Sequence, residues 1–276
     1  MAADELTPMS TNSPRASDLF RLDGRIAFVS GAAGHLGRVM ALTLADAGAH
    51  VIVNGRNPKP LEDLVAEIEA RKGSAAPAAF DIGDIATCRV FFTSRTRLDI
   101  IVNNAISMTP RPFGDLAEED FDQTYRTGVV APFEIARAAL PALRTAVRET
   151  GEASIVNIAS MYGTVAPDAR LYARAEQASP FHYGPAKAAL LQMTRHLAAE
   201  FGREGIRVNA LVPGPFPRDS VIKTDPQFAE RLAAKTMLAR VAHANEICGP
   251  LLFLASPASS FVTGAALAVD GGWTAW

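Results

Sequence analysis

Residues 25–37 read RIAFVSGAAGHLG, and this stretch decides the fold. Its first six residues are mostly apolar, which is typical of a short strand buried on both faces. The small residues that follow, ahead of a helical pattern ending at Gly48, predict a tight turn into a helix. Such a turn lets the backbone approach a pyrophosphate, because free N–H groups and partial positive charge gather at a helix N-terminus. The alternative interpretation is a tight turn without a ligand.

Outward from this stretch, short apolar strands alternate with helical patterns along the chain. We expect further strands at 49–54, 98–103, 154–159, 206–212 and 265–269, and one more strand that ends at residue 80. Helices are expected at 59–71, 84–96, 117–147, 181–202, 228–239 and 245–254. Pro132 and Pro141 are expected to bend or divide the long helix. The alternation predicts an α/β protein with one doubly wound, Rossmann-like parallel sheet and helices on both faces. Residues 1–20 are expected to be a disordered N-terminal extension, and residues 21–276 a single dinucleotide-binding domain.

The composition argues against several classes of protein. The 276 residues include 27 Lys and Arg against 29 Asp and Glu, so the basic surface of a nucleic-acid binder is not expected. No run of about 18 apolar residues suggests a membrane span, and the first 17 residues do not resemble a secretory signal. Cys88, Cys248 and five scattered histidines predict neither a disulfide framework nor a metal site. We therefore expect a soluble cytoplasmic protein.

The end of the second expected strand indicates which dinucleotide would bind. Residues 53–57 read VNGRN, with Arg56 and no carboxylate. An acidic residue here would hold the adenosine ribose hydroxyls of NAD, whereas an arginine offers a charged fork to a 2′-phosphate. NADP(H) is therefore favoured, with NAD(H) as the alternative. An Arg56 that is simply solvated at a strand end is the interpretation without a functional role.

A phenol and an ammonium lie four residues apart at the start of another expected helix. In the segment YGPAK, Tyr183 and Lys187 would share one helix face. A phenol with an ordinary pKa of about 10 is a poor base at neutral pH, and a nearby cation favours the phenolate. Ser160, just after the strand at 154–159, is placed to hydrogen-bond the same substrate oxygen. The Tyr–Lys spacing alone would also fit a surface pair, but its occurrence with the glycine turn favours a catalytic site.

From residue 20 to residue 273, the order of these motifs resembles the short-chain dehydrogenase/reductase family, in its short single-domain branch. The resemblance implies that Tyr183 is the acid/base, that Ser160 orients the carbonyl or alcohol, and that Lys187 binds the nicotinamide ribose while lowering the tyrosine pKa. It also implies a larger set of cofactor-binding residues. Besides Tyr183 and Lys187, these are Gly31, His35, Leu36 and Gly37 in the turn, Arg56, Asp81 and Ile82, Asn104 and Ala105, and Pro213, Gly214 and Phe216. Family members are usually homotetramers or homodimers.

Four positions depart from the family pattern, and the mildest departure is Ser30 in place of a threonine. His35 stands where the turn usually has its middle glycine, and Ile106 replaces the last glycine of the motif that begins at Asn103. Gly128 occupies the place of the family's asparagine, which usually fixes a water in the proton relay behind the lysine. Two interpretations follow. An extra water beside Gly128 would restore the relay, or Gly128 merely lets the helix bend ahead of Pro132.

The segment between Ser160 and Tyr183 is longer than in the family, and its inserted part, 166–180, is rich in polar side chains. This polarity suits a hydroxylated or carboxylated small-molecule substrate, and a surface or subunit-contact loop is the alternative. A stiff, proline-rich segment from Pro213 is expected to lead into a mobile lid at 219–227. The predicted function is an NADP(H)-dependent oxidoreductase acting on a secondary alcohol or ketone, sugar-derived or polyol-like. The competing prediction is a catalytically weak dinucleotide-binding protein with a regulatory or scaffold role.

Overall fold

The computed structural model describes residues 15–173 and 178–276 of the chain. Most of the expected N-terminal extension lies outside the described residues, as do residues 174–177 of the inserted segment. The described part of the extension contains a 3₁₀ turn at Asp18–Phe20. Leu22, which follows, is only 1% exposed, so the chain is packed against the core by this point.

Seven parallel strands form one sheet in the order β3-β2-β1-β4-β5-β6-β7. The strands are β1 (Ile26–Val29), β2 (His50–Gly55), β3 (Ser74–Ala79), β4 (Ile100–Asn103), β5 (Ala153–Ile158), β6 (Ile206–Pro213) and β7 (Ala266–Val269). The doubly wound parallel sheet predicted from the sequence is confirmed. The order reverses between β1 and β4, and ligands of such sheets bind at the carboxyl ends of the strands at this point.

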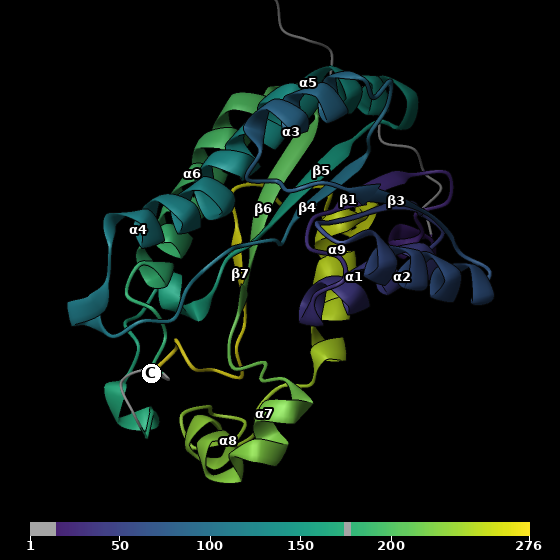
Figure 1. The fold of residues 1–276 in the computed structure, drawn as a ribbon. Helices are drawn as coiled ribbons and strands as arrows, with labels where there is room; N and C mark the ends of the chain where they lie inside the picture. Colours follow the sequence, from purple (N-terminus) through teal and green to yellow (C-terminus); the bar gives the residue numbers. More distant parts are fainter. Residues whose placement is uncertain (1–14, 174–177) are drawn as a thin grey trace, which may run out of the picture.

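Helices cover both faces of the sheet (Figure 1). One layer contains α3 (Ile85–Thr93), α5 (Ala131–Thr150) and α6 (Tyr183–Phe201), and the other contains α1 (His35–Asp46), α2 (Pro58–Ala70) and α9 (Cys248–Ala255). Each layer buries an apolar cluster against the strands. As a result, β5 and β6 are buried at every residue, including the polar residues Ser154, Asn157, Arg207 and Asn209.

The long helix expected at 117–147 is divided. α4 (Glu118–Tyr125) leads into a π-helical turn at Arg126–Val130, and α5 follows directly. Pro132 has no N–H to donate to the carbonyl of Gly128 four residues earlier, so the regular α-helical register cannot continue here. The break therefore lies just ahead of Pro132, whereas Pro141 stays inside α5.

After β6 the chain passes beyond the carboxyl edge of the sheet and forms α7 (Asp219–Thr224) and α8 (Pro226–Ala233) (Figure 1). The helix expected at 228–239 therefore begins and ends earlier, and the expected lid segment contains a helix of its own. The start of α8 is fixed by Asp225, whose carboxylate accepts a hydrogen bond from the N–H of Phe228 at 2.9 Å. Pro226 takes the first helical position, where its missing N–H costs nothing.

Short 3₁₀ turns complete the described structure. They lie at Phe113–Asp115, Met161–Gly163, Ala169–Leu171, Gly202–Glu204, Ala244–Ile247 and Pro257–Ser259. Within residues 15–173 and 178–276, no helix combines the length and the apolar character needed to cross a membrane. In the same ranges, no group of three or more His, Cys, Asp or Glu side chains is arranged to hold a metal ion.

Candidate active site

The residues singled out in the sequence converge on the carboxyl edge of the sheet. The glycine turn follows β1, Asn104 follows β4, Ser160 lies just after β5, and Pro213 ends β6. A cavity of about 800 Å³ opens at this edge, lined by the glycine turn, the end of β2 and the segment after β4. It lies where the strand order reverses, which is the usual ligand site of a doubly wound sheet.

Hydrogen bonds hold the glycine turn against the segment after β4. The Ser30 hydroxyl accepts the N–H groups of Asn104 at 2.9 Å and Ala105 at 3.0 Å. Gly31 has a φ of +63°, and a Cβ there would lie 3.1 Å from atoms of Ala105. A Cβ on Gly37 would collide with the carbonyl of Gly31. The turn is therefore a backbone cradle that fits a pyrophosphate, because no side chain fills it.

The predicted turn positions do not all face this cavity. Gly31 lines it, together with Ala33 and Gly34, whereas His35 and Leu36 do not. Leu36 packs against the apolar core instead. The Nε2 atom of His35 is buried and has no hydrogen-bond partner among the described residues. The imidazole that replaces the family's glycine therefore leaves the cavity clear.

Arg56 lies at the end of the cavity beside β2. The Asn54 amide donates to two carbonyls at the end of β3, at 2.9 and 3.1 Å, which fixes the strand end that carries Arg56. Asp81 and Ile82 line the same part of the cavity. Arg56 is exposed, and its guanidinium pairs with none of the residues that the structure describes. A free arginine at this position suits a phosphate monoester on the adenosine ribose.

Ser160, Tyr183 and Lys187 lie together where β5 ends and α6 begins. Tyr183 is the first residue of α6 and Lys187 is one turn later, with its Nζ 5.6 Å from the centre of the Tyr183 ring. The Lys187 ammonium donates to the carbonyl of Ile158 at 2.6 Å. The Ser160 hydroxyl accepts the N–H of Tyr162 at 3.2 Å, which caps the 3₁₀ turn after β5. The three side chains predicted to act together are thus neighbours.

Burial controls the charges of this site. Lys187 is 3% exposed, and burial lowers its pKa to about 7. Burial also raises the pKa of the Tyr183 phenol, while the Ser160 hydroxyl opposes that rise. Both shifts have one cause, because surroundings of low polarity penalise the charged form of either group. The Lys187 cation was expected to lower the pKa of the Tyr183 phenol. In the structure, the pKa is raised instead, because burial is the larger effect.

Ile106 and Gly128, two of the departures from the family pattern, contact each other. A Cβ on Gly128 would lie 2.9 Å from Cδ1 of Ile106 and 4.0 Å from Cβ of Ala186, the residue before Lys187. The Ile106 side chain thus fills the space that a side chain at position 128 would take. A water at that Cβ position would contact the apolar Ile106 side chain at 2.9 Å, which does not support the water relay. The bend ahead of Pro132, the other interpretation, agrees with the observed π-helical turn.

The inserted segment packs against the region that follows β6. Asp168 forms ion pairs with Arg170 at 2.8 Å and with Lys235 at 3.0 Å. Hydrogen bonds from Arg170 and Lys235 hold the pKa of the Asp168 carboxyl well below its usual range. The rings of Tyr172 and Phe228 lie 5.5 Å apart, centre to centre. The Asp168 carboxylate is therefore engaged within the protein, whereas the Arg170 side chain, which pairs with Asp168, is 86% exposed.

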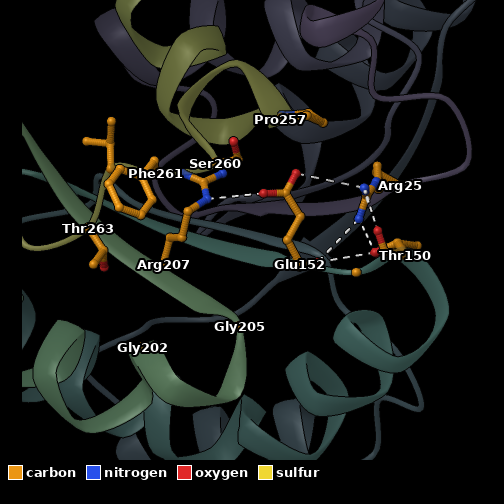
Figure 2. A pocket seen from close by; sticks show the side chains of 12 residues that line it. Arg25, Thr150, Glu152, Gly202, Gly205, Arg207, Pro257, Ser260, Phe261 and Thr263 are labelled. Carbon is orange, nitrogen blue, oxygen red and sulfur yellow. Dashed lines mark hydrogen bonds and ion pairs between the residues drawn. The ribbon is translucent and has the colours of Figure 1, made fainter. Parts of the chain in front are cut away.

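Two other cavities open elsewhere on the protein. One, of about 630 Å³, lies at the amino edge of the sheet, where Glu152 pairs with Arg207 at 3.1 Å and with Arg25 at 3.9 Å (Figure 2). The other, of about 870 Å³, is lined mostly by small and apolar residues, including Phe181. Ser160, Tyr183 and Lys187 line neither this cavity nor the one of about 800 Å³.

The predicted cofactor-binding residues after β6 lie outside the lining of the 800 Å³ cavity. Pro213, Gly214 and Phe216 do not line the 800 Å³ cavity, and Phe216 packs against the apolar core. The residue of this segment that reaches the cavity is Arg218. Sequence reasoning missed Arg218, because nothing in the segment PGPFPRDS distinguishes it from an ordinary surface arginine.

Comparison with known proteins identifies the family. A family model described as Enoyl-(Acyl carrier protein) reductase matches residues 31–274. The gluconate 5-dehydrogenase of Gluconobacter oxydans (strain 621H) is 32% identical over 265 residues, which cover 93% of this chain and 97% of that protein. The chain belongs to the short-chain dehydrogenase/reductase family. This short-chain dehydrogenase/reductase is also 31% identical to the 7alpha-hydroxysteroid dehydrogenase of Escherichia coli (strain K12), over 93% of this chain and 96% of that protein.

A solved structure supports the same assignment. The gluconate 5-dehydrogenase from Burkholderia cenocepacia J2315, in complex with NADP and tartrate, matches with a TM-score of 0.83 and 31% sequence identity. The match covers 95% of this short-chain dehydrogenase/reductase and 100% of that chain. The family and the fold predicted from the sequence are thus both confirmed, and the family's enzymes are oxidoreductases that act on CH–OH groups.

Proposed function

We propose that this chain is an NADP(H)-dependent oxidoreductase that interconverts a secondary alcohol and the corresponding ketone in a sugar-derived small molecule. The observation that carries the proposal is the convergence of Ser160, Tyr183 and Lys187 on the sheet edge that also holds the glycine turn. A positioned acid/base beside a dinucleotide cradle suits hydride transfer that is coupled to proton transfer.

The residues of this chain handle the proton and the substrate oxygen. A bound nicotinamide supplies or accepts the hydride. During reduction, Tyr183 donates its phenolic proton to the carbonyl oxygen while the carbonyl carbon receives the hydride, and during oxidation the phenolate takes a proton back. Ser160 hydrogen-bonds the same oxygen and fixes its position. Protonated Lys187, whose Nζ is 5.6 Å from the Tyr183 ring, stabilises the phenolate that remains.

Two observations support NADP(H) over NAD(H). The end of β2 carries Arg56 and no carboxylate, and the Arg56 guanidinium pairs with no described residue. The similar gluconate 5-dehydrogenase structure was determined with NADP. A 2′-phosphate beside Arg56 would form charge-assisted hydrogen bonds, which are roughly twice as strong as neutral ones.

The comparisons favour a polyhydroxylated substrate. Two gluconate 5-dehydrogenases match this chain over more than nine-tenths of its length, one by sequence and one by structure. The 7alpha-hydroxysteroid dehydrogenase makes a steroid the competing substrate class. The chemistry at the reacting carbon is the same in either case, so the two classes differ in the walls of the substrate site and not in Ser160, Tyr183 and Lys187.

A substrate panel tests the proposal. Purified enzyme is mixed with NADPH or NADH and with keto-sugar acids, ketoses, steroid ketones and β-ketoacyl thioesters, and turnover is followed by absorbance at the nicotinamide band. We expect turnover of a keto-sugar acid or ketose with NADPH, and none with the Tyr183→Phe variant. Turnover of steroid ketones alone would contradict the substrate class. NADPH binding without any turnover across the panel would favour the scaffold role instead.

We further propose that residues 21–276 act as one domain and that the enzyme assembles as a homodimer or homotetramer. Exposed apolar side chains support assembly: Val130 and Phe133, at the junction of the π-helical turn and α5, are 43% and 41% exposed. Contiguous exposed apolar patches mark contacts between proteins, and these two side chains lie three residues apart on one helical stretch. Light scattering after size-exclusion chromatography measures the assembly, and a monomer at micromolar concentration would contradict it.

A further inference from the structure

His182, the residue before Tyr183, is a fully buried polar side chain to which the mechanism gives no role. It stands directly before α6, and its carbonyl accepts the N–H of Ala186 at 3.2 Å, in the first turn of that helix. This turn also carries the Tyr183 phenol. A displacement of His182 would therefore displace the phenol as well.

The two ring nitrogens of His182 contact two different segments. Nε2 lies 3.3 Å from the carbonyl oxygen of Thr109, in the segment after β4, and Nδ1 lies 3.2 Å from Oγ1 of Thr124, in α4. The Thr124 hydroxyl also donates to the carbonyl of Ser107 at 2.9 Å. The imidazole therefore joins the start of α6 both to α4 and to the segment after β4.

The partners of the ring decide where its proton lies. A carbonyl oxygen can only accept, so the hydrogen bond to Thr109 requires a proton on Nε2. In a neutral imidazole, Nδ1 is then an acceptor to which the Thr124 hydroxyl can donate. Thr124 is fully buried, as His182 is, so water does not replace either partner. An apolar side chain of similar size would fill the space but would lose both contacts.

The segment that His182 contacts lines two cavities. Ser107 lines the 800 Å³ cavity, whereas Arg111 and Phe113 line the cavity of about 870 Å³. Residues 104–112, which connect them, form neither helix nor strand. Their backbone has no ladder of hydrogen bonds, so the position of this segment depends on side-chain contacts such as those of His182.

We propose that His182 is a positioning residue, which fixes the Tyr183 phenol relative to the segment after β4 that lines the 800 Å³ cavity. This inference rests on the proposed oxidoreductase function. His182 lines neither the 800 Å³ nor the 870 Å³ cavity, so it acts through Tyr183 and not on the substrate. Misplacing a reacting group by about 1 Å can slow a reaction by about 100-fold.

Three substitutions separate the hydrogen bonds of His182 from the volume of its ring. His182→Leu removes both bonds, His182→Asn places an amide near the position of Nδ1, and His182→Gln places one near that of Nε2. With NADPH and a substrate identified by the panel, His182→Leu should lower kcat at least about tenfold, while the NADPH dissociation constant changes less than about threefold. His182→Asn and His182→Gln should each recover part of this loss.

An isotope effect and a matched control distinguish positioning from packing. With NADPH deuterated at the transferred hydrogen, the isotope effect on kcat should be larger in His182→Leu than in the wild type, because hydride transfer becomes slower relative to product release. His196 is exposed on the same helix, so His196→Leu should leave kcat and the isotope effect unchanged. If His182→Leu does not fold, Thr124→Val, which removes only the hydroxyl, should lower kcat at least about threefold.

Hydrogen exchange tests the contact without a substrate. The amides of residues 107–113 should exchange faster in His182→Leu, or in Thr124→Val, than in the wild type and in His196→Leu. A kcat within about twofold of the wild type in the folded variant would overturn the inference, as would equal kcat in His182→Leu, His182→Asn and His182→Gln, or unchanged exchange. A wild type without turnover across the substrate panel would instead refute the proposed function.

Discussion

Adding a methyl group at Gly128 tests whether Gly128 and Ile106 form one packed unit. The substitution Gly128→Ala has two opposing effects. Alanine in place of glycine within a helix stabilises it by up to about 1 kcal/mol. The new Cβ would however lie 2.9 Å from Cδ1 of Ile106, whereas non-bonded carbons prefer about 3.5–4.0 Å, so Ile106 must shift. Overpacking costs about 1–3 kcal/mol, but Cδ1 is the far end of a flexible, half-buried side chain, so the cost lies near the lower limit and we expect a net loss of at most about 1 kcal/mol in the free energy of unfolding.

Removing the contacting atom reverses the sign of this effect. Ile106→Val deletes Cδ1 and keeps the rest of the side chain. In the Ile106→Val background, Gly128→Ala should therefore stabilise the protein by about 0.5–1 kcal/mol, because the helix gains and the close contact is gone. The coupling energy between the two positions is then about 1 kcal/mol or more. Urea unfolding of the wild type, both single variants and the double variant, followed by circular dichroism, measures this coupling.

Gly249 in α9 provides the matched control. No heavy atom lies within 4 Å of a Cβ built on Gly249. Gly249→Ala should therefore have the same effect on stability whether residue 106 is isoleucine or valine. If Gly128→Ala and Ile106→Val instead add within about 0.5 kcal/mol, the two positions are independent and the packing argument is wrong.

Three further predictions concern the candidate site. Tyr183→Phe should reduce turnover at least about 100-fold with the NADPH dissociation constant nearly unchanged, because only the transferable proton is lost; steady-state kinetics with fluorescence titration checks this. Arg56→Asp should weaken NADPH about tenfold more than NADH, and equal weakening would place the 2′-phosphate elsewhere. The pKa of Lys187 is lowered from 10.5 to about 7, so the unfolded chain binds its proton up to a higher pH than the folded chain does. Stability should therefore rise between pH 7 and 10, by at most about 1.4 kcal/mol per pH unit from this group, and Lys187→Met should abolish that rise in urea unfolding.

Burial on both faces made the fold predictable from the sequence. Strands such as β1 (IAFV) and β4 (IIVN) are apolar at nearly every position, and that pattern is visible without coordinates. The region after β6 gave no comparable signal. The six residues of α7, DSVIKT, include none that is buried, so no apolar periodicity marks the helix. The start of α8 depends on the Asp225 cap and on Pro226, which are local features that periodicity does not report.

The candidate site was predictable where it consists of short motifs. Tyr183 and Lys187 are one helical turn apart, so their spacing in the sequence already places them together. Contacts between distant segments were not predictable in this way. Lys235 meets Asp168 only because the inserted segment packs on the region around α8. Arg218 likewise reaches the cavity through the path of the chain after β6, which no local pattern describes.

Ile106 and Gly128 both depart from the family pattern, and in the structure the two departures compensate each other in packing. In the structure, Ile106 supplies the volume that Gly128 lacks, beside Ala186, the neighbour of Lys187. With isoleucine in place of the family's glycine and glycine in place of its asparagine, the space stays filled but the polar side chain is lost. An isoleucine side chain can form no hydrogen bond. Ala186 and Lys187 are consecutive in α6 and so point to different sides of the helix. The pair therefore bears on the packing between the π-helical turn and α6.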